Sequence, residues 1–479
     1  MTDTVILSAQ DLAEITGGTW SVTSNIPEFL RISVNAKEIQ PGDLLITTNL
    51  EQWPASRTSS ETQRVLDKVA TMGAAALIRK ESTLGGANVL RVENTYGALQ
   101  AIANAVRDKS TAQRILVTGT EGKTGFKVLF AHLTSEQVSL NTKLDSKNMD
   151  IGIHLTLANT KQRHQISLIE VAVPHLKYGK RRSHIVKPNL CVITEIGYEH
   201  LAKHGSVENL IAAKASVVAG LQANGCCLVK SDPRYYQKLR GHILAYGDIP
   251  IVTFGHNADD YAQLLNADFD SELLGWEVKV RIETEQYHYF LPALEEHAPL
   301  SSVGVLAAIS LMGLDLSEAV QRFTSYQPFQ TSGRFYELAV HAGSYSIYDQ
   351  SFRSSVLGII DFFKVAARLK PRSGGQKILV LGPVYDEQEY GSIIWELLPP
   401  SYLGDLIQQA QFDKIYTIGN PDDFQECLQG VTAPRRHFLH PKEAVHPLTE
   451  YLRANDLLMI KGDKLDEMIL ISTMLREQA

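Results

Sequence analysis

The most constraining feature of the chain is a short apolar strand, Ile115–Val117, that runs into a glycine-containing turn and then into a helical pattern. Gly119 and Gly122 allow the backbone of the turn to direct its N–H groups at an anion. Lys123 adds a positive charge, and the Thr124 hydroxyl is a suitable ligand for Mg²⁺. The next segment repeats apolar residues at helical spacing, which predicts a helix packed on a sheet: Phe126, Leu129, Phe130 and Leu133. The stretch predicts a phosphate-binding loop in an α/β domain, and the alternative is a turn that only joins strand to helix.

Length and composition indicate a large soluble protein of several domains. The chain has 479 residues, of which 44% are hydrophobic, enough for about three domains. The formal net charge of −7 gives no overall positive field to hold nucleic acid or an anionic membrane. The 4 cysteines lack metal-binding spacing, which indicates reduced thiols in a cytoplasmic protein. No apolar stretch reaches the ~18 residues of a membrane span, and the sequence does not indicate an oligomeric state.

Alternating strand and helix patterns predict an α/β fold of three domains. Residues 1–108 form a small α/β domain, residues 109–330 a mostly parallel sheet with helices on both faces, and residues 331–479 a Rossmann-like domain. The central strands are expected at Ile115–Val117, Ile166–Val173, Leu190–Ile196, Cys227–Val229 and Ile251–Phe254, followed by a hairpin at Trp276–Leu291 and a helix at Ser302–Met312. Ligands of such sheets bind at the carboxyl ends of the strands, where we expect the site.

Two charged residues stand in segments that are otherwise apolar. Glu170 ends a strand in which burial of a carboxylate costs free energy unless a cation accompanies it, so we predict a metal ligand. Lys214 lies in a helical segment, Val207–Val218, whose apolar face would enter the core. The alternative for Lys214 is a surface lysine whose stem covers apolar neighbours.

Several motifs resemble the Mur ligase family. The loop is a shorter variant of the phosphate-binding pattern, G-T-x-G-K-T, and Pro188–Leu201 matches the family's T-N-I-G-x-x-H-L. Gly333-Arg334 matches the Gly-Arg pair at the family's last domain junction. The segment Ile32–Leu45 is similar to the N-terminal domain of the members that extend the peptidoglycan peptide, especially those that add D-alanyl-D-alanine. The resemblance spans all three domains.

This resemblance implies an ATP-dependent ligase that joins a carboxylate to an amine. The carboxylate attacks the γ-phosphate of ATP, and the amine then attacks the acyl phosphate. The resemblance implies catalytic roles for Lys123, Lys214, His200 and Arg334, Mg²⁺ ligation by Thr124, Glu170, His200 and a carbamylated Lys214, nucleotide contacts from Gly119, Thr120, Glu121, Gly122, Lys123, Thr124, Arg334 and Asp349, and a substrate contact from Asn148. For His200 the alternative is a polar loop residue, and for Asn148 it is a helix N-cap.

Other positions depart from the family pattern. The family's Asp-Ser-Arg is Asn35-Ala36-Lys37 here, which favours a specialised or secondary-metabolite substrate over the alternative, a UDP-muramoyl peptide of cell-wall synthesis. Glu195 and Gly304 replace asparagines, and Gln350 replaces an acidic residue. These three changes leave open a nucleotide-binding protein that has lost turnover. The basic run Lys177–Arg182 is expected to be a solvated loop.

Overall fold

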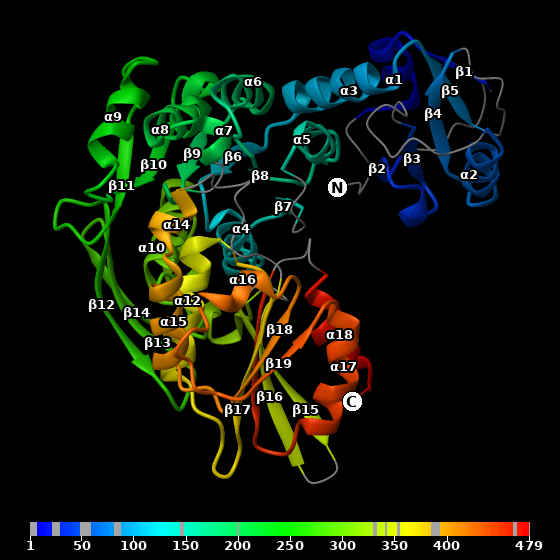
Figure 1. The fold of residues 1–479 in the computed structure, drawn as a ribbon. Coiled ribbons are helices and arrows are strands. Elements are labelled where there is room, and N and C mark those ends of the chain that lie inside the picture. Colours follow the sequence, from blue (N-terminus) through cyan, green and yellow to red (C-terminus); the bar gives the residue numbers. More distant parts are fainter. Residues whose placement is uncertain are drawn as a thin grey trace.

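The computed structural model describes residues 7–21, 29–47, 59–80, 88–143, 148–198, 201–328, 333–340, 343–351, 355–384, 393–462 and 467–478. They build three sheets that follow one another along the chain, each combined with helices, and this confirms the predicted α/β fold of three domains (Figure 1). The expected boundaries near residues 108 and 330 fall between the sheets, and we propose them as domain boundaries. Within the described ranges, no helix combines the length and the apolar character needed to cross a membrane.

The N-terminal sheet has the strand order β1-β5-β4-β3-β2, in which β1 pairs antiparallel and the other strands are parallel. Helix α1 begins at a capping box between Ser8 and Asp11, which satisfies N–H groups of its first turn. The Asn159 side chain, beyond α5 of the next domain, exchanges two hydrogen bonds with the backbone of Ile32 at 2.8 and 2.9 Å. The elements are α1 (Ala9–Thr16), β1 (Thr19–Trp20), β2 (Arg31–Ser33), η1 (Ala36–Glu38), β3 (Asp43–Ile46), α2 (Ser59–Thr71), β4 (Ala75–Arg79), β5 (Val89–Val92) and α3 (Thr95–Lys109).

The central sheet has nine strands in the order β14-β13-β12-β11-β10-β9-β6-β8-β7. It is parallel from β7 to β12, as predicted, and the antiparallel strands β13 and β14 extend it. Sequence patterns missed the long strand β12. The strands are β6 (Gln113–Thr118), β7 (Leu140–Asn141), β8 (Ile166–Glu170), β9 (Leu190–Ile193), β10 (Cys226–Lys230), β11 (Ile251–Gly255), β12 (Ala262–Asp270), β13 (Gly275–Ile282) and β14 (Glu285–Leu291).

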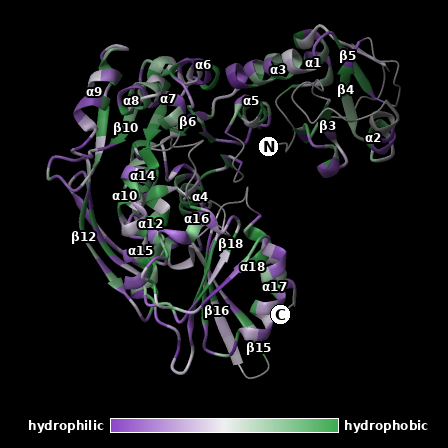
Figure 2. Cartoon of the chain, in the orientation of Figure 1, coloured by the Kyte–Doolittle hydropathy of each residue, from purple (hydrophilic) through white to green (hydrophobic). Residues whose placement is uncertain are grey.

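Helices cover both faces of this sheet. Side chains of α4 and α10 pack in one apolar core, and those of α5, α8 and α9 pack in another that continues into the N-terminal domain. Figure 2 shows hydrophobic residues on the strands in the middle of the sheet and hydrophilic residues on the outer sides of the helices. The helices are α4 (Lys123–Leu133), α5 (Asp150–Ala158), α6 (Leu176–Val186), α7 (Leu201–His204), α8 (Val207–Ala215), α9 (Tyr236–Leu244), α10 (Ala298–Leu311) and α11 (Leu316–Gln321), with 3₁₀ turns η2 (Ser216–Gly220) and η3 (Arg322–Ser325).

The basic run Lys177–Arg182 lies in helix α6, so the expectation of a solvated loop is wrong. The physical reason is that Gly179, within the run, lies against η2. A Cβ at Gly179 would lie 2.0 Å from the Ser216 hydroxyl oxygen, so only glycine permits this approach. Ser183 continues the buried face of the helix. The charged residues thus belong to a helix anchored on the central domain.

The C-terminal sheet has the order β15-β16-β20-β17-β18-β19 and is parallel except for the β15–β16 pair. Side chains of α12 and α15 fill one apolar core and those of α17 and α18 another, which gives the predicted three layers. Its elements are β15 (Arg334–Val340), β16 (Gly343–Gln350), α12 (Val356–Arg368), β17 (Lys377–Leu381), α14 (Ile394–Leu397), α15 (Pro400–Gln409), β18 (Lys414–Ile418), α16 (Asp422–Gln425), β19 (Arg435–Phe438), α17 (Pro441–Tyr451), β20 (Leu457–Lys461) and α18 (Ile469–Gln478).

Candidate active site

The glycine loop connects β6 to α4 at the carboxyl end of the central sheet. Gly119 and Gly122 have φ angles of 154° and 79°, in the region that favours glycine. A Cβ at Gly119 would lie 2.1 Å from the Thr194 hydroxyl oxygen, so the loop also requires glycine for space. The Thr120 N–H donates to the Glu195 carbonyl at 2.8 Å, and the Thr120 hydroxyl accepts from the Gly197 N–H at 2.9 Å. The segment after β9 therefore holds the loop in place.

Lys123 is the first residue of α4 and is buried. Its ammonium donates to the carbonyl oxygens of Gly119 and Thr120 at 2.8 and 2.7 Å. The positive charge of Lys123 therefore lies next to the backbone of the loop. The first turn of α4 presents backbone N–H groups at the same end of the sheet. This combination suits a phosphate group.

Glu170, at the end of β8, accepts hydrogen bonds from three side chains, two on α4 and one just before α5. The Thr124 hydroxyl donates to Oε2 at 3.1 Å, Asn148 Nδ2 donates to Oε1 at 2.9 Å, and the Lys127 ammonium pairs with Oε2 at 2.9 Å. Burial alone would raise the pKa of Glu170, but Lys127, the Asn148 hydrogen bond and Lys123 together hold this pKa below its ordinary value. Glu170 is therefore a buried, ionised carboxylate beside the loop.

The structure resolves the alternatives for two of the predicted residues. Helix α5 is capped at Met149 without a side-chain hydrogen bond, so the alternative of Asn148 as an N-cap is wrong. The side chain of Lys214 is 1% exposed on α8, so the alternative of a surface lysine is also wrong. His200 lies outside the described residues.

The oxygen atoms of Thr124 and Glu170 fit a hard cation such as Mg²⁺, which prefers oxygen ligands. The carboxylate is already ionised and directed at the Thr124 hydroxyl. In the part of the chain that the structure describes, no group of three or more His, Cys, Asp and Glu side chains is placed to hold a metal ion. Phosphate oxygens of a bound ligand would complete the coordination shell of a cation held here.

Sequence reasoning missed Lys127, whose side chain is 2% exposed. It stands four residues after Lys123, on the same side of α4, and this spacing is the signal that could have revealed it. Because Lys127 is buried against Glu170, its charge compensates a carboxylate that water does not reach. Removing one member of such a pair is far more costly than removing both.

We expect Lys127→Met to lower the free energy of unfolding by about 3 to 5 kcal/mol, because it leaves Glu170 buried without a cation. The double variant with Glu170→Gln should recover most of this loss, since neither charge then remains. Lys109→Met is the matched control, because Lys109 pairs with Asp11 at 3.0 Å at the surface and should matter by about 1 kcal/mol or less. Denaturant unfolding measures all three, and wild-type stability of Lys127→Met would contradict the assignment.

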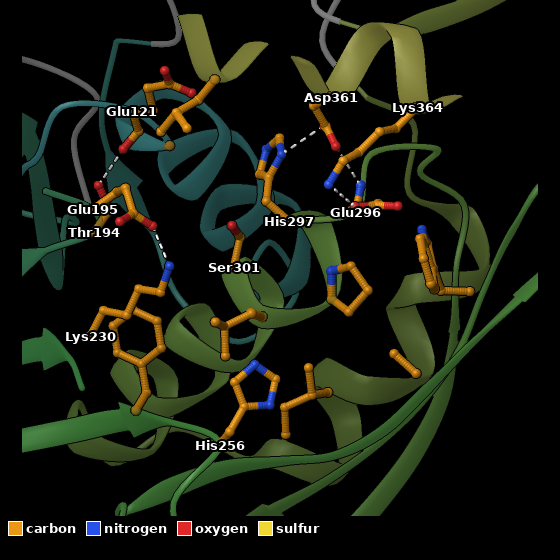
Figure 3. Close-up of a pocket in the computed structure, with 18 of the residues that line it drawn as sticks. Glu121, Thr194, Glu195, Lys230, His256, Glu296, His297, Ser301, Asp361 and Lys364 are labelled. Atoms are coloured by element: carbon orange, nitrogen blue, oxygen red, sulfur yellow. Dashed lines mark hydrogen bonds and ion pairs between the residues drawn. The ribbon is translucent and has the colours of Figure 1, made fainter. Parts of the chain in front are cut away.

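A cavity of about 600 Å³ opens beside the loop (Figure 3). Glu121 and Gly122 form part of its wall, together with Glu195 and the start of α10. Residues of α12 in the C-terminal domain form the opposite wall: Leu357, Ile360, Asp361 and Lys364. A ligand with phosphates on the loop would thus extend between two domains, which is common for binding clefts.

Charged residues line this cavity in pairs. Glu195 forms an ion pair with Lys230, the last residue of β10, and Arg234 lies 4.0 Å from the other carboxylate oxygen (Figure 3). His297 Nδ1 lies 3.0 Å from an Asp361 carboxylate oxygen. The His297 side chain is 58% exposed, and the neighbouring Asp361 carboxylate raises the pKa of His297 above its ordinary value. Lys230 and Arg234 therefore balance the charge of Glu195. Sequence patterns did not indicate Lys230 or His297.

The absence of a side chain at Gly304 has a packing reason. A Cβ there would lie 2.9 Å from the Phe254 ring, which itself lines the cavity. The aromatic ring therefore occupies the space that a side chain at position 304 would need, and it offers the ligand an apolar surface instead of a hydrogen bond.

Residues predicted in the C-terminal domain lie near the domain junction. Arg334 pairs with Asp349 in the β15–β16 register, and the Arg334 side chain is outside the described part. Asp349 is buried, and one of its carboxylate oxygens accepts from the Ser351 N–H at 3.0 Å. Gln350 donates to Glu295 at 3.2 Å and accepts from Lys461 at 3.3 Å, so the amide links the two domains.

Comparison with known proteins gives a consistent picture. The Mur ligase middle domain matches residues 117–299. The UDP-N-acetylmuramoyl-tripeptide–D-alanyl-D-alanine ligase of Rickettsia prowazekii (strain Madrid E) is 22% identical over 93% of this chain and 96% of its own length, and that of Buchnera aphidicola (subsp. Acyrthosiphon pisum) is 23% identical over 97% and 96%.

Solved structures show the same fold. A structure of MurF from Acinetobacter baumannii superposes with a TM-score of 0.81 at 18% identity and covers 99% of this chain and all of that one. MurF from Thermotoga maritima in complex with ADP gives a TM-score of 0.70 at 17% identity and covers 94% and 97%. At such identities the structures speak for the fold alone. Residues 117–299 match the Mur ligase middle domain, and over nearly its whole length the chain is similar to ligases of that family.

Proposed function

We propose that the protein is an ATP-dependent ligase that joins the carboxylate of a UDP-muramoyl peptide to the amine of a short peptide such as D-alanyl-D-alanine. The observation that carries this proposal is the Thr124–Glu170–Asn148 cluster directly beside the phosphate loop. The full-length relatives carry names of ligases for that peptidoglycan precursor. The expectation of a specialised or secondary-metabolite substrate finds no support among them.

The phosphate loop and its lysine account for nucleotide binding. The backbone N–H groups of residues 122–124 and the Lys123 ammonium would hold the phosphates of ATP, and the nucleoside would extend into the cavity beside Glu195. As charge moves during phosphoryl transfer, the ammonium is already in place and needs no reorganisation. This is why the loop, rather than the cavity, is expected to carry most of the rate enhancement.

Glu170 and Thr124 would hold Mg²⁺ together with phosphate oxygens, and Lys214 would join them as a carbamate. When bound, Mg²⁺ neutralises charge on the transferring phosphoryl group. Asn148 already fixes one oxygen of Glu170, so the carboxylate is oriented before any ligand arrives. His200 and Arg334 keep the proposed roles of metal ligand and phosphate contact.

In the proposed reaction the substrate carboxylate attacks the γ-phosphorus of ATP, the bond to the β–γ bridging oxygen breaks, and ADP leaves. The amine then attacks the acyl carbon, and phosphate leaves with the bonding electrons as the amide forms. Water would compete for the acyl phosphate, so the site has to close during this step. The cavity wall from α12 provides a surface that excludes water once the two domains meet.

In the altered segment Asn35-Ala36-Lys37, the Asn35 side chain forms hydrogen bonds with residues close to it in the sequence. Asn35 Oδ1 accepts from the Lys37 N–H at 3.1 Å at the start of η1, and Asn35 Nδ2 donates to Glu38 at 2.6 Å. These contacts give the replacement a structural role, which is compatible with retention of a UDP-sugar substrate by the same domain.

The function is tested by release of ADP in a matrix of carboxylates and amines that includes UDP-N-acetylmuramoyl-tripeptide with D-alanyl-D-alanine. The proposal predicts ADP release that requires both substrates together. Nucleotide binding without ADP release for any pair would instead identify a binding protein that has lost turnover.

A further inference from the structure

Arg182 lies in α6, behind the site rather than in it, and its side chain is 1% exposed. Burial of a guanidinium is unfavourable unless its donors are satisfied. Here Nε donates to Asp150 Oδ1 at 2.6 Å, Nη1 donates to the Ala172 carbonyl, and Nη2 lies 3.7 Å from the sulfur of Met149. One side chain therefore contacts two segments that are far apart in the sequence.

These two segments carry the residues of the site. Asn148 immediately precedes the Met149–Asp150 pair, and Ala172 follows Glu170 by two residues. The Ala172 N–H donates to the Asn148 carbonyl at 3.0 Å, and the Asn148 amide donates to Glu170 at 2.9 Å. The Arg182 guanidinium therefore joins the same two segments that the Asn148–Glu170 hydrogen bond joins. Of these contacts, the Asn148–Glu170 hydrogen bond lies next to the phosphate loop.

The neighbouring Arg181 provides a contrast. It also pairs with Asp150, through the other carboxylate oxygen, but its side chain is 53% exposed and packs over the Tyr178 ring of its own helix. An exposed pair of this kind contributes little. Adjacent arginines on one helix therefore share a partner, but only one of them ties the two segments together.

We infer that Arg182 is a positioning residue, which holds Asn148 and Glu170 in the geometry that receives the Mg²⁺–nucleotide complex. The inference rests on the proposed function for the identity of that ligand. Its structural part, the coupling of the 148–150 and 170–172 segments through one buried guanidinium, rests on the contacts alone. Residues that orient metal ligands without touching the metal often change affinity or activity by about 10- to 100-fold.

The test compares Arg182→Met with Arg181→Met in the full-length protein. Binding of Mn²⁺ in the presence of ADP, followed by electron paramagnetic resonance, reports on the site directly, and steady-state kinetics with varied Mg²⁺ reports on turnover. We expect Arg182→Met to weaken Mn²⁺ binding and to lower kcat by about tenfold or more, while affinity for ADP without metal stays within about twofold. Arg181→Met should behave as wild type in both.

Asp150→Asn tests the same contact from the other side and covers the case in which Arg182→Met fails to fold. Asp150→Asn should lower Mn²⁺ affinity and kcat, but by less than Arg182→Met does. The double variant should have the Mn²⁺ affinity and kcat of Arg182→Met alone, because both substitutions act through one contact. Arg182→Lys should recover little, since an ammonium cannot reach both segments as a planar fork does. Wild-type Mn²⁺ affinity and kcat in folded Arg182→Met would overturn the inference.

The outcome is separable from that of the proposed function. If the wild-type protein shows neither Mn²⁺ binding nor turnover, the function fails, and amide hydrogen exchange then decides the structural part. Faster exchange in residues 148–158 of Arg182→Met than of Arg181→Met supports it, and equal exchange overturns it.

Discussion

Lys123→Ala is expected to abolish ATP turnover. The ammonium spans the loop through two carbonyl oxygens at 2.8 and 2.7 Å, where it would follow the charge of the migrating phosphoryl group. Loss of such a preorganised cation costs several kcal/mol of transition-state stabilisation, which corresponds to a rate decrease of about a thousandfold or more. Release of ADP in the presence of both substrates measures the effect.

Lys377→Ala is the matched control for this variant. Lys377 is likewise buried, and its ammonium also donates to two backbone carbonyls, of Ala366 and Ala410, but it lies in the C-terminal sheet. Any loss of stability from removing a buried lysine should appear in both variants, whereas loss of ADP release should appear only in Lys123→Ala. Turnover by Lys123→Ala within a few fold of wild type would remove the phosphate loop from the mechanism.

Lys214→Ala is expected to inactivate the enzyme, and short carboxylates such as acetate should partly restore activity. A buried ammonium beside a bound cation would repel it, whereas a carbamate formed by attack of the neutral amine on CO₂ supplies oxygen ligands. Acetate can occupy the space left by the shortened side chain and replace those oxygens.

Two measurements distinguish the carbamate from a structural lysine. A carbamate carbon signal should appear by nuclear magnetic resonance in wild-type protein supplied with ¹³C-bicarbonate and should be missing in Lys214→Ala. Rescue should depend on the concentration and size of the added carboxylate. Full activity of Lys214→Ala without any additive would show that the residue plays no part in the site.

The conformation of the glycine loop was predictable because its information is local. Two glycines, Lys123 and Thr124 follow one another, and the spacing of apolar residues fixes the helix that comes next. The position of Glu170 was predictable for a related reason, since parallel strands place their carboxyl ends at one edge of the sheet.

The partners of these residues were not predictable, because tertiary packing decides them. Lys127 meets Glu170 across 43 positions of the chain, and Lys230 meets Glu195 across 35. Lys230 has no sequence pattern that distinguishes it from a surface lysine, and for Lys127 the only signal is its spacing of four residues from Lys123. Helix α6 was missed for a similar reason, since the charges of Lys177–Arg182 indicated a solvated loop, whereas the missing side chain of Gly179 allows the helix to contact η2.

The most direct test of the account is the product of one reaction. The protein is incubated with ATP, Mg²⁺, UDP-N-acetylmuramoyl-tripeptide and D-alanyl-D-alanine, and the mixture is analysed by mass spectrometry together with the amount of ADP. The account predicts a new amide whose mass equals that of the two substrates minus water, formed in a one-to-one ratio with ADP. ATP binding without any such amide, or ligation only of carboxylates that lack the UDP-muramoyl group, would contradict it.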